Sequence, residues 1–150
     1  MVECITWDEK YKYEFKRLNL KWVQEFFEVE EADTKQFEYP ETIVNDGGEI
    51  FFLLDKDKVI GTVAMMKHGD EYELSKLAVD DGYKGQGLSK ILMDASIKWV
   101  KDKGYKSILI ISNTKLEPAI NLYKKYGFET IHLGQHPSYS RANIVMRKML

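Results

Sequence analysis

Leu77–Ser89 reads LAVDDGYKGQGLS and joins a strand-like segment to a helix-like one. Tyr72–Val79 is rich in apolar residues, whereas from Leu88 to Val100 the apolar residues recur at spacings of three and four, which predicts one face of a helix. Glycines at such a junction let the backbone approach a ligand closely, and the unpaired N–H groups of a helix start attract anions. The residues of this stretch therefore fit either a pyrophosphate site or an ordinary glycine turn.

Two other phosphate-binding motifs do not fit the glycine stretch. The dinucleotide fingerprint requires a third glycine at the position of Lys90, and the triphosphate loop requires Gly-Lys followed by Ser or Thr, an order that Lys84–Lys90 lacks. A Rossmann or P-loop nucleotide site is therefore not expected.

The segments around this stretch predict a mixed sheet. Residues expected to form strands are 50–54, 59–66, 72–79, 107–112, 128–133 and 142–149, and residues expected to form helices are 88–104 and 116–123. In the N-terminal part, Asp8 is expected to cap a helix, a second short helix is expected over Trp22–Val29, and Glu30–Gly48 is expected to be a loop with one helical turn. The fold class is α/β (α+β): a mixed, mostly antiparallel sheet with a central parallel pair and flanking helices, in one domain over residues 1–150.

Composition excludes several functional classes. The 150 residues carry 22 Lys and Arg against 24 Asp and Glu, so the net charge is -2 and no nucleic-acid binder is expected. Cys4 is the one cysteine, and His68, His132 and His136 do not have metal-ligand spacing, so we expect no metal. The sequence shows no membrane span and no signal-peptide pattern, so we expect a cytoplasmic protein.

Four short motifs occur together in one order. They are LAV at 77–79, KGQGL at 84–88, AINLY at 119–123 and YGF at 126–128. In this combination the sequence resembles the GNAT superfamily of acyl-coenzyme A-dependent N-acetyltransferases. The resemblance implies that a bulge splays the strand ending at Val79 from the strand ending at Ser112, and that acetyl-coenzyme A lies in the gap.

The resemblance also implies a set of cofactor-binding residues. Backbone groups near Val79 would bond the pantetheine amides, N–H groups of the glycine stretch would hold the pyrophosphate, and the helix after Leu116 would form the far wall. The residues concerned are Leu77, Ala78, Val79, Lys84, Gly85, Gln86, Gly87, Leu88, Ser89, Asn113, Ala119 and Tyr123. The sequence departs from the family pattern where Gly82 replaces Gln or Arg, Lys84 replaces Arg, Ser89 replaces Gly or Ala, and Leu116 replaces an Asn.

Acetylation of an amine requires a proton acceptor, because an alkylamine has a pKa of about 10.4 and is charged at neutral pH. By resemblance, Glu73 is the candidate base and Tyr123 the candidate acid that protonates the departing thiolate. The same residues also fit a solvated strand glutamate and a core-packing tyrosine. Cys4 lies near the end of the chain in an expected edge strand and is not expected to act as a nucleophile.

The resemblance places the acceptor pocket between the first helices and the turn before the last strand. Candidate acceptor-binding residues are Trp22, Phe26, Glu30, Tyr139 and Arg141. Five acids within residues 25–33 fit either a cationic acceptor such as a polyamine or an ordinary solvated helix face, whereas Arg141 could hold an acceptor's carboxylate.

The expected function is direct acetyl transfer to a primary amine of a small molecule or peptide. The alternative is a non-catalytic acyl-coenzyme A sensor or interaction module. A homodimer is also possible, with the last strand (residues 142–149) pairing at a sheet edge.

Overall fold

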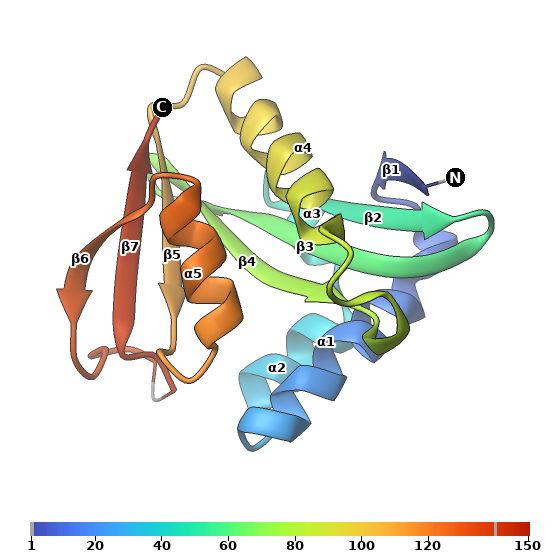
Figure 1. Ribbon diagram of the computed structural model, residues 1–150, viewed down its shortest axis with the longest axis horizontal. Coiled ribbons are helices and arrows are strands. Elements are labelled where there is room, and N and C mark those ends of the chain that lie inside the picture. The colour runs from blue at the N-terminus through green and yellow to red at the C-terminus, as the bar shows by residue number, and fades with distance from the viewer. Residues whose placement is uncertain (1, 140) are drawn as a thin grey trace.

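One mixed sheet divides the helices into two layers (Figure 1). The computed structural model describes residues 2–139 and 141–150. Within these residues, seven strands have the order β1-β2-β3-β4-β5-β7-β6. Their bounds are β1 Val2–Thr6, β2 Glu49–Asp55, β3 Lys58–His68, β4 Glu71–Val79, β5 Ser107–Ser112, β6 Glu129–Leu133 and β7 Ile144–Met149. All neighbouring strands are antiparallel except β4 and β5, which confirms the predicted fold class.

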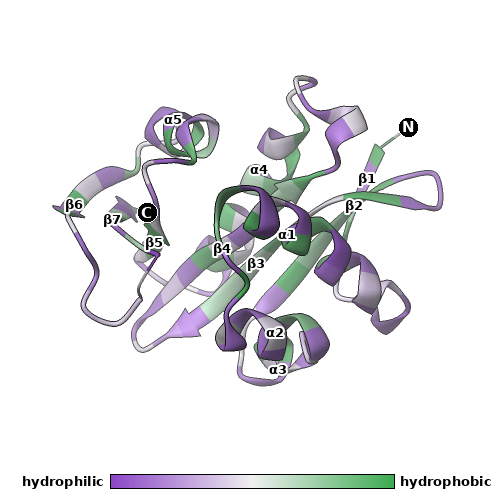
Figure 2. Cartoon of the chain, turned by 90° about the horizontal axis from the view of Figure 1, so that it is seen from below, coloured by the Kyte–Doolittle hydropathy of each residue, from purple (hydrophilic) through white to green (hydrophobic). Residues whose placement is uncertain are grey.

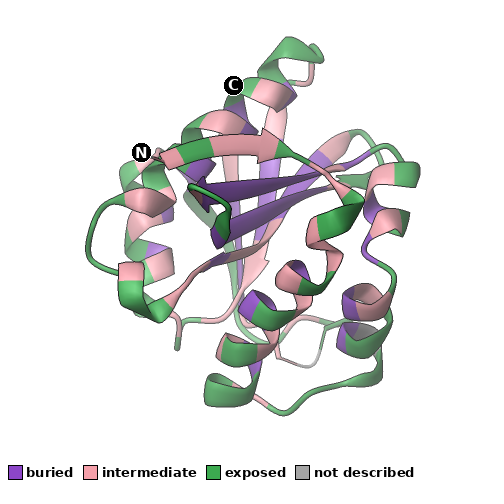
Figure 3. Ribbon diagram, turned by 90° about the vertical axis from the view of Figure 1, so that its right-hand side faces the viewer, coloured by how far each residue is buried: buried purple, intermediate pink, exposed green. Residues whose placement is uncertain are grey.

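Each face of the sheet has its own core. On one face, α4 (Leu88–Asp102) and α5 (Glu117–Lys125) bury residues such as Leu92 and Ile120. On the other face, α1 (Lys12–Phe26), α2 (Glu31–Glu38) and α3 (Glu41–Asn45) bury residues such as Phe15, Phe37 and Ile43. The central strands are the most buried part of the chain (Figure 3), and hydrophobic residues gather on them while the connecting loops are hydrophilic (Figure 2).

The parallel contact between β4 and β5 is short. Register pairs join only Tyr72 to Ile108 and Glu73 to Leu109, after which the two strands separate. On its other side β4 has a bulge, because two residues, Lys76 and Leu77, stand opposite Val63 of β3. Lys76 has a φ of +57°, in the left-handed region that bulges use. A bulge bends its strand. The bulge follows the last β4–β5 pair by three residues, so it lies where the two strands separate.

Three sequence-based predictions need correction. Residues 30–48 form helices α2 and α3 rather than a loop with one turn, because the Asp33 carboxylate accepts the Glu30 N–H at 2.9 Å and so closes the first turn of α2. Glutamate is a rare N-cap residue, which hid this start. The expected second helix at 22–29 is the end of α1, which stops at Phe26.

The third correction concerns the last strand. β7 pairs with both β5 and β6, so it is an inner strand, and β6 and β1 form the edges of the sheet. Cys4 lies in edge strand β1, as expected. The Asp8 side chain caps the short 3-10 helix η1 (Glu9–Tyr11) that leads into α1. None of the described helices combines the length and apolar character needed to cross a membrane.

Candidate functional site

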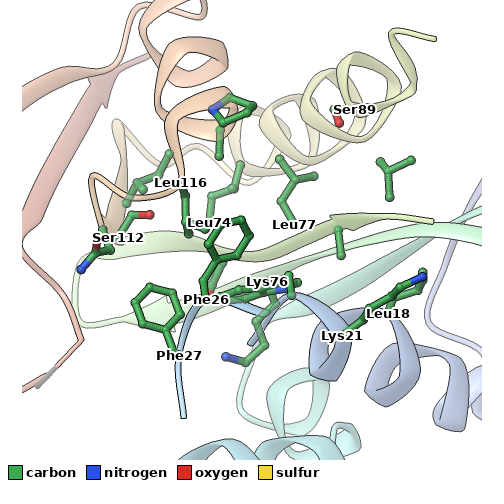
Figure 4. A pocket seen from close by; sticks show the side chains of 18 of the residues that line it. Leu18, Lys21, Phe26, Phe27, Leu74, Lys76, Leu77, Ser89, Ser112 and Leu116 are labelled. Carbon is green, nitrogen blue, oxygen red and sulfur yellow. The ribbon is translucent and has the colours of Figure 1, made fainter. Parts of the chain in front are cut away.

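A cavity of about 870 Å³ opens where β4 and β5 separate. Its walls come from both strands, from α1 and α2 on one side of the sheet, and from α4 and α5 on the other (Figure 4). On the β5 side, the backbone of β4 beyond Glu73 has no strand partner within the described chain. The cavity therefore exposes an open strand edge, which suits a ligand that carries amide groups.

The glycine stretch forms one end of this cavity. Gly85 and Gly87 have φ values of +79° and +73°, and Gly87 is the N-cap of α4, which has no side-chain cap. The first N–H groups of α4 are therefore left for an anion. The cavity is lined by Lys84, Gly85, Gly87, Leu88 and Ser89, whereas Gln86 does not line it.

Lys84 is engaged at the surface beside the glycine stretch. Its Nζ forms an ion pair of 3.0 Å with the Asp81 carboxylate, which also pairs with Lys21 of α1. The two lysines lower the pKa of Asp81 by hydrogen bonding. This end of the cavity thus carries two cations around one acid, a net positive charge that suits phosphates.

Tyr123 of α5 lies in the wall of the cavity and is 6% exposed. Its ring packs against Phe128, with ring centroids 6.0 Å apart. Among the described residues, its hydroxyl neither donates nor accepts a hydrogen bond. Burial raises the pKa of this hydroxyl, so it keeps its proton at neutral pH and can serve as a donor to a ligand.

Glu73 lies on the opposite side of β4. Because Tyr72 and Leu74 face the core under α4 and α5, strand alternation directs Glu73 toward the layer of α1 and α2. The side chain is 9% exposed and lines the cavity. Burial raises its pKa, while Lys76 and His68 act in the opposite direction. A carboxylate with a raised pKa is a better proton acceptor than an exposed one.

Lys76, at the bulge, is a cavity residue that the sequence reasoning missed. Its Nζ lies 5.7 Å from the centre of the buried Phe37 ring, on the same side of the sheet as Glu73. Burial lowers the pKa of this amine, and the charges of Asp33 and Glu73 partly oppose that effect. The adjacent polar residues Ser75 and Lys76 interrupt the alternation of the strand, which marks the position of the bulge in the sequence.

Arg141 lines the cavity, but its guanidinium is paired with acids of the chain. Its guanidinium donates to both carboxylate oxygens of Asp33, to the Glu30 carboxylate at 2.9 Å and to the Glu28 carbonyl at 3.0 Å. It therefore joins the segment before β7 to α2. The role of Arg141 in holding an acceptor's carboxylate stays a prediction, and three groups of the chain already accept hydrogen bonds from its guanidinium.

The remaining predicted acceptor residues surround the same opening. Trp22, Phe26, Glu30 and Tyr139 line the cavity. Asn113 also lines it, but its amide donates to the Arg141 carbonyl at 2.6 Å and its side-chain oxygen accepts the Lys115 N–H, so it fixes the loop between β5 and α5. A shallower hollow of about 590 Å³ adjoins the opening between the end of α1 and this loop.

Comparison with known proteins matches most of the chain to one family. Residues 16–128 match the sequence model of the Acetyltransferase (GNAT) family. Human N-acetyltransferase 8B is 25% identical over 103 residues, covering 64% of this chain and 45% of that protein. The matched segment thus spans less than half the length of this relative.

Solved structures share the whole fold. A GNAT-family acetyltransferase from Staphylococcus aureus superimposes with a TM-score of 0.89 at 23% identity, over 100% of this chain and 99% of the other. The PaiA N-acetyltransferase of Thermoplasma acidophilum, in complex with coenzyme A, gives a TM-score of 0.77 at 17% identity, over 100% and 99%. At these identities the similarity of the structures establishes the fold alone.

Proposed function

Because the chain belongs to the acetyltransferase (GNAT) family, we propose that it transfers an acetyl group directly from acetyl-coenzyme A to a primary amine. The observation that carries this proposal is the gap between β4 and β5, which has a helix start at one end and Tyr123 and Glu73 on its two sides. No other described cavity combines an anion site with a candidate acid and base.

The residues present fit coenzyme A. The uncapped start of α4 offers N–H groups for the pyrophosphate, and the open edge of β4 at Leu77 and Val79 offers backbone groups for the pantetheine amides. Ala119 and Tyr123 of α5 close the other side of the gap. Bound in this way, acetyl-coenzyme A supplies an activated thioester carbonyl near the bulge.

Glu73 and Tyr123 divide the proton transfers. Glu73 accepts the proton of the acceptor ammonium, directly or through a water molecule, so that the amine can attack the carbonyl carbon. The N–C bond forms and the C–S bond breaks, Tyr123 gives its proton to the departing sulfur, and the second proton that the nitrogen loses on becoming an amide returns to Tyr123. The apolar surroundings that keep Tyr123 protonated also make a thiolate more basic, so the two groups are matched. The N–H of Val79 can polarise the carbonyl.

Release of coenzyme A tests the proposal. The protein is incubated with acetyl-coenzyme A and a panel of polyamines, amino acids, aminoglycosides and lysine peptides, and free thiol is measured. Amine-dependent release, together with a singly acetylated product found by mass spectrometry, is the expected result. Tight binding of coenzyme A without release for any amine would instead favour the non-catalytic sensor.

A further inference from the structure

The Lys76 ammonium is a cation inside the cavity that the proposed acetyl transfer leaves without a role. The bulge gives Lys76 a left-handed backbone, so its side chain leaves β4 toward α2 while Leu77 lies on the side of α4 and α5 (Figure 4). It is partly buried and lies against the Phe37 ring. Its ammonium therefore lies on the acceptor side of the cavity (Figure 4).

No carboxylate of the described chain binds Lys76. Asp33 and Glu73 are near enough to influence it, but neither forms an ion pair with its Nζ within 4.0 Å. Asp33 is bound by both terminal nitrogens of Arg141. Apart from the face of Phe37, the ammonium has no partner among the described residues, and a buried charge without a partner is costly unless a ligand supplies one.

Glu73 and Lys76 together form a pair of opposite charges that are not bonded to each other. They lie three residues apart on one strand and on one side of the sheet. A ligand with an ammonium and a carboxylate attached to one carbon atom can satisfy both groups at once. In that arrangement the amine is next to the proposed base.

We propose that Lys76 binds the carboxylate of the acceptor, and that the acceptor is a free α-amino acid whose amine faces Glu73. This inference rests on the proposed acetyl transfer and names the substrate class of the same site. A polyamine would place a second cation beside Lys76, and a protein N-terminus has an amide where the free carboxylate is required. Arg141 is less available for this role, because Glu30 and Asp33 already bind it.

The test compares each amino acid with its primary amide and its decarboxylated amine, with spermidine as a further probe. An α-amine beside an amide has a pKa of about 8, and in the free amino acid the negative carboxylate raises that pKa, so the amide has the larger fraction of neutral amine. A preference for the acid over the amide would therefore oppose intrinsic reactivity and must come from the site. The measurement is kcat/KM for coenzyme A release.

Two variants of Lys76 and one control variant separate the effect of the ammonium charge from that of packing. Lys76→Met keeps the packing on Phe37 but removes the ammonium, and Lys76→Arg keeps a cation at the same backbone φ. Lys67→Met removes a charge from an exposed position of neighbouring β3, outside the cavity. Thermal unfolding of each variant with bound coenzyme A checks that the fold is retained.

We expect the wild-type protein to prefer at least one amino acid over its amide by about tenfold or more, the effect of a hydrogen-bonded charge pair. Lys76→Met brings this ratio close to one, mainly through KM for the acid, whereas Lys76→Arg and Lys67→Met retain a preference. Amides or amines that react as well as the acids, or a ratio unchanged in Lys76→Met, would overturn the inference but not the acetyl transfer.

Two other results also decide the question. Acetylation of Lys76 itself, detected by peptide mass spectrometry without an added acceptor, would show that the residue is an acceptor rather than a carboxylate site. Absence of coenzyme A release with every probe would refute the proposed function and this inference together.

Discussion

The two ends of the β4–β5 pair are built from the same strands but have opposite properties. At the closed end, Tyr72 and Glu73 pair with Ile108 and Leu109. The Glu71 carboxylate of β4 accepts a hydrogen bond from the Ser107 hydroxyl of β5 at 2.8 Å. It also forms a two-point ion pair with Arg147 of β7. At the open end, from Leu74 and Ile110 onward, β4 and β5 are not paired with each other, and both line the cavity.

The difference shows how one sheet can be both a scaffold and a binding site. Aromatic packing reinforces the closed end, where the Tyr72 ring lies 4.6 Å from Tyr105 and 5.0 Å from Trp99, between ring centroids. A few residues later the bulge at Lys76 bends β4 away from β5. The closed end therefore holds the two strands in register while the open end remains available for a strand-like ligand.

The largest expected effect comes from Tyr123→Phe at the open end. Removal of the hydroxyl lowers kcat for amine acetylation by about a hundredfold or more, because the departing thiolate loses its donor, while the affinity for coenzyme A changes little. Steady-state kinetics and calorimetry measure the two quantities. Tyr126→Phe is the matched control, since the Tyr126 hydroxyl binds Asp94 outside the cavity. Equal kcat values for the two variants would remove Tyr123 from the mechanism.

Glu73→Gln, at the boundary between the two ends, is expected to lower kcat/KM about ten- to a hundredfold. Burial raises the pKa of Glu73, and the base must be ionised, so wild-type activity falls as the pH falls through a value above the ordinary glutamate range of about 4.3. The variant should lose this acidic fall in activity. If the fall is unchanged in the variant, a group other than Glu73 causes it.

Substitution of the glycine stretch tests the anion site. Gly87→Ala places a side chain at a φ of +73°, with no atom within 4 Å of the new Cβ, so its cost is the left-handed backbone alone. That cost of about 1–2 kcal/mol corresponds to roughly tenfold weaker binding of coenzyme A if the loop changes its conformation. Gly69→Ala has the same kind of strain at a φ of +62° in the β3–β4 turn and serves as control. Calorimetry should show weaker binding for Gly87→Ala alone.

The smallest effect is expected at the closed end. Glu71→Gln should lower the free energy of unfolding by about 1 kcal/mol at neutral pH, as for a partly exposed ion pair. Arg147 lowers the pKa of Glu71, so this contribution is present above the unfolded-state pKa of about 4.3 and is lost as the pH falls through the lower folded-state value. Urea unfolding at neutral and acidic pH measures it. A difference from wild type that persists at low pH would contradict the linkage.

Short-range patterns accounted for most of the fold. The helix period from Leu88 to Val100 and the β2–β3 hairpin were predicted from spacing and turn residues, and both are present. Helix α2 was missed because its first turn is closed by Glu30 and Asp33, and few apolar residues mark its face. The inner position of β7 was missed because strand order depends on contacts between distant segments, which no local pattern encodes.

At the site, local sequence was enough to predict the parts: a glycine-rich helix start, a glutamate in a strand and a tyrosine on a helix. These depend on local conformation and residue chemistry, which the sequence expresses directly. Which charged side chains of the site pair with each other depends on the tertiary structure. Arg141 is bound by acids of a segment more than a hundred positions away, whereas Lys76, in an otherwise ordinary strand, is left without an acid partner among the described residues. Ion pairing depends on distance in space, and the fold alone sets that distance.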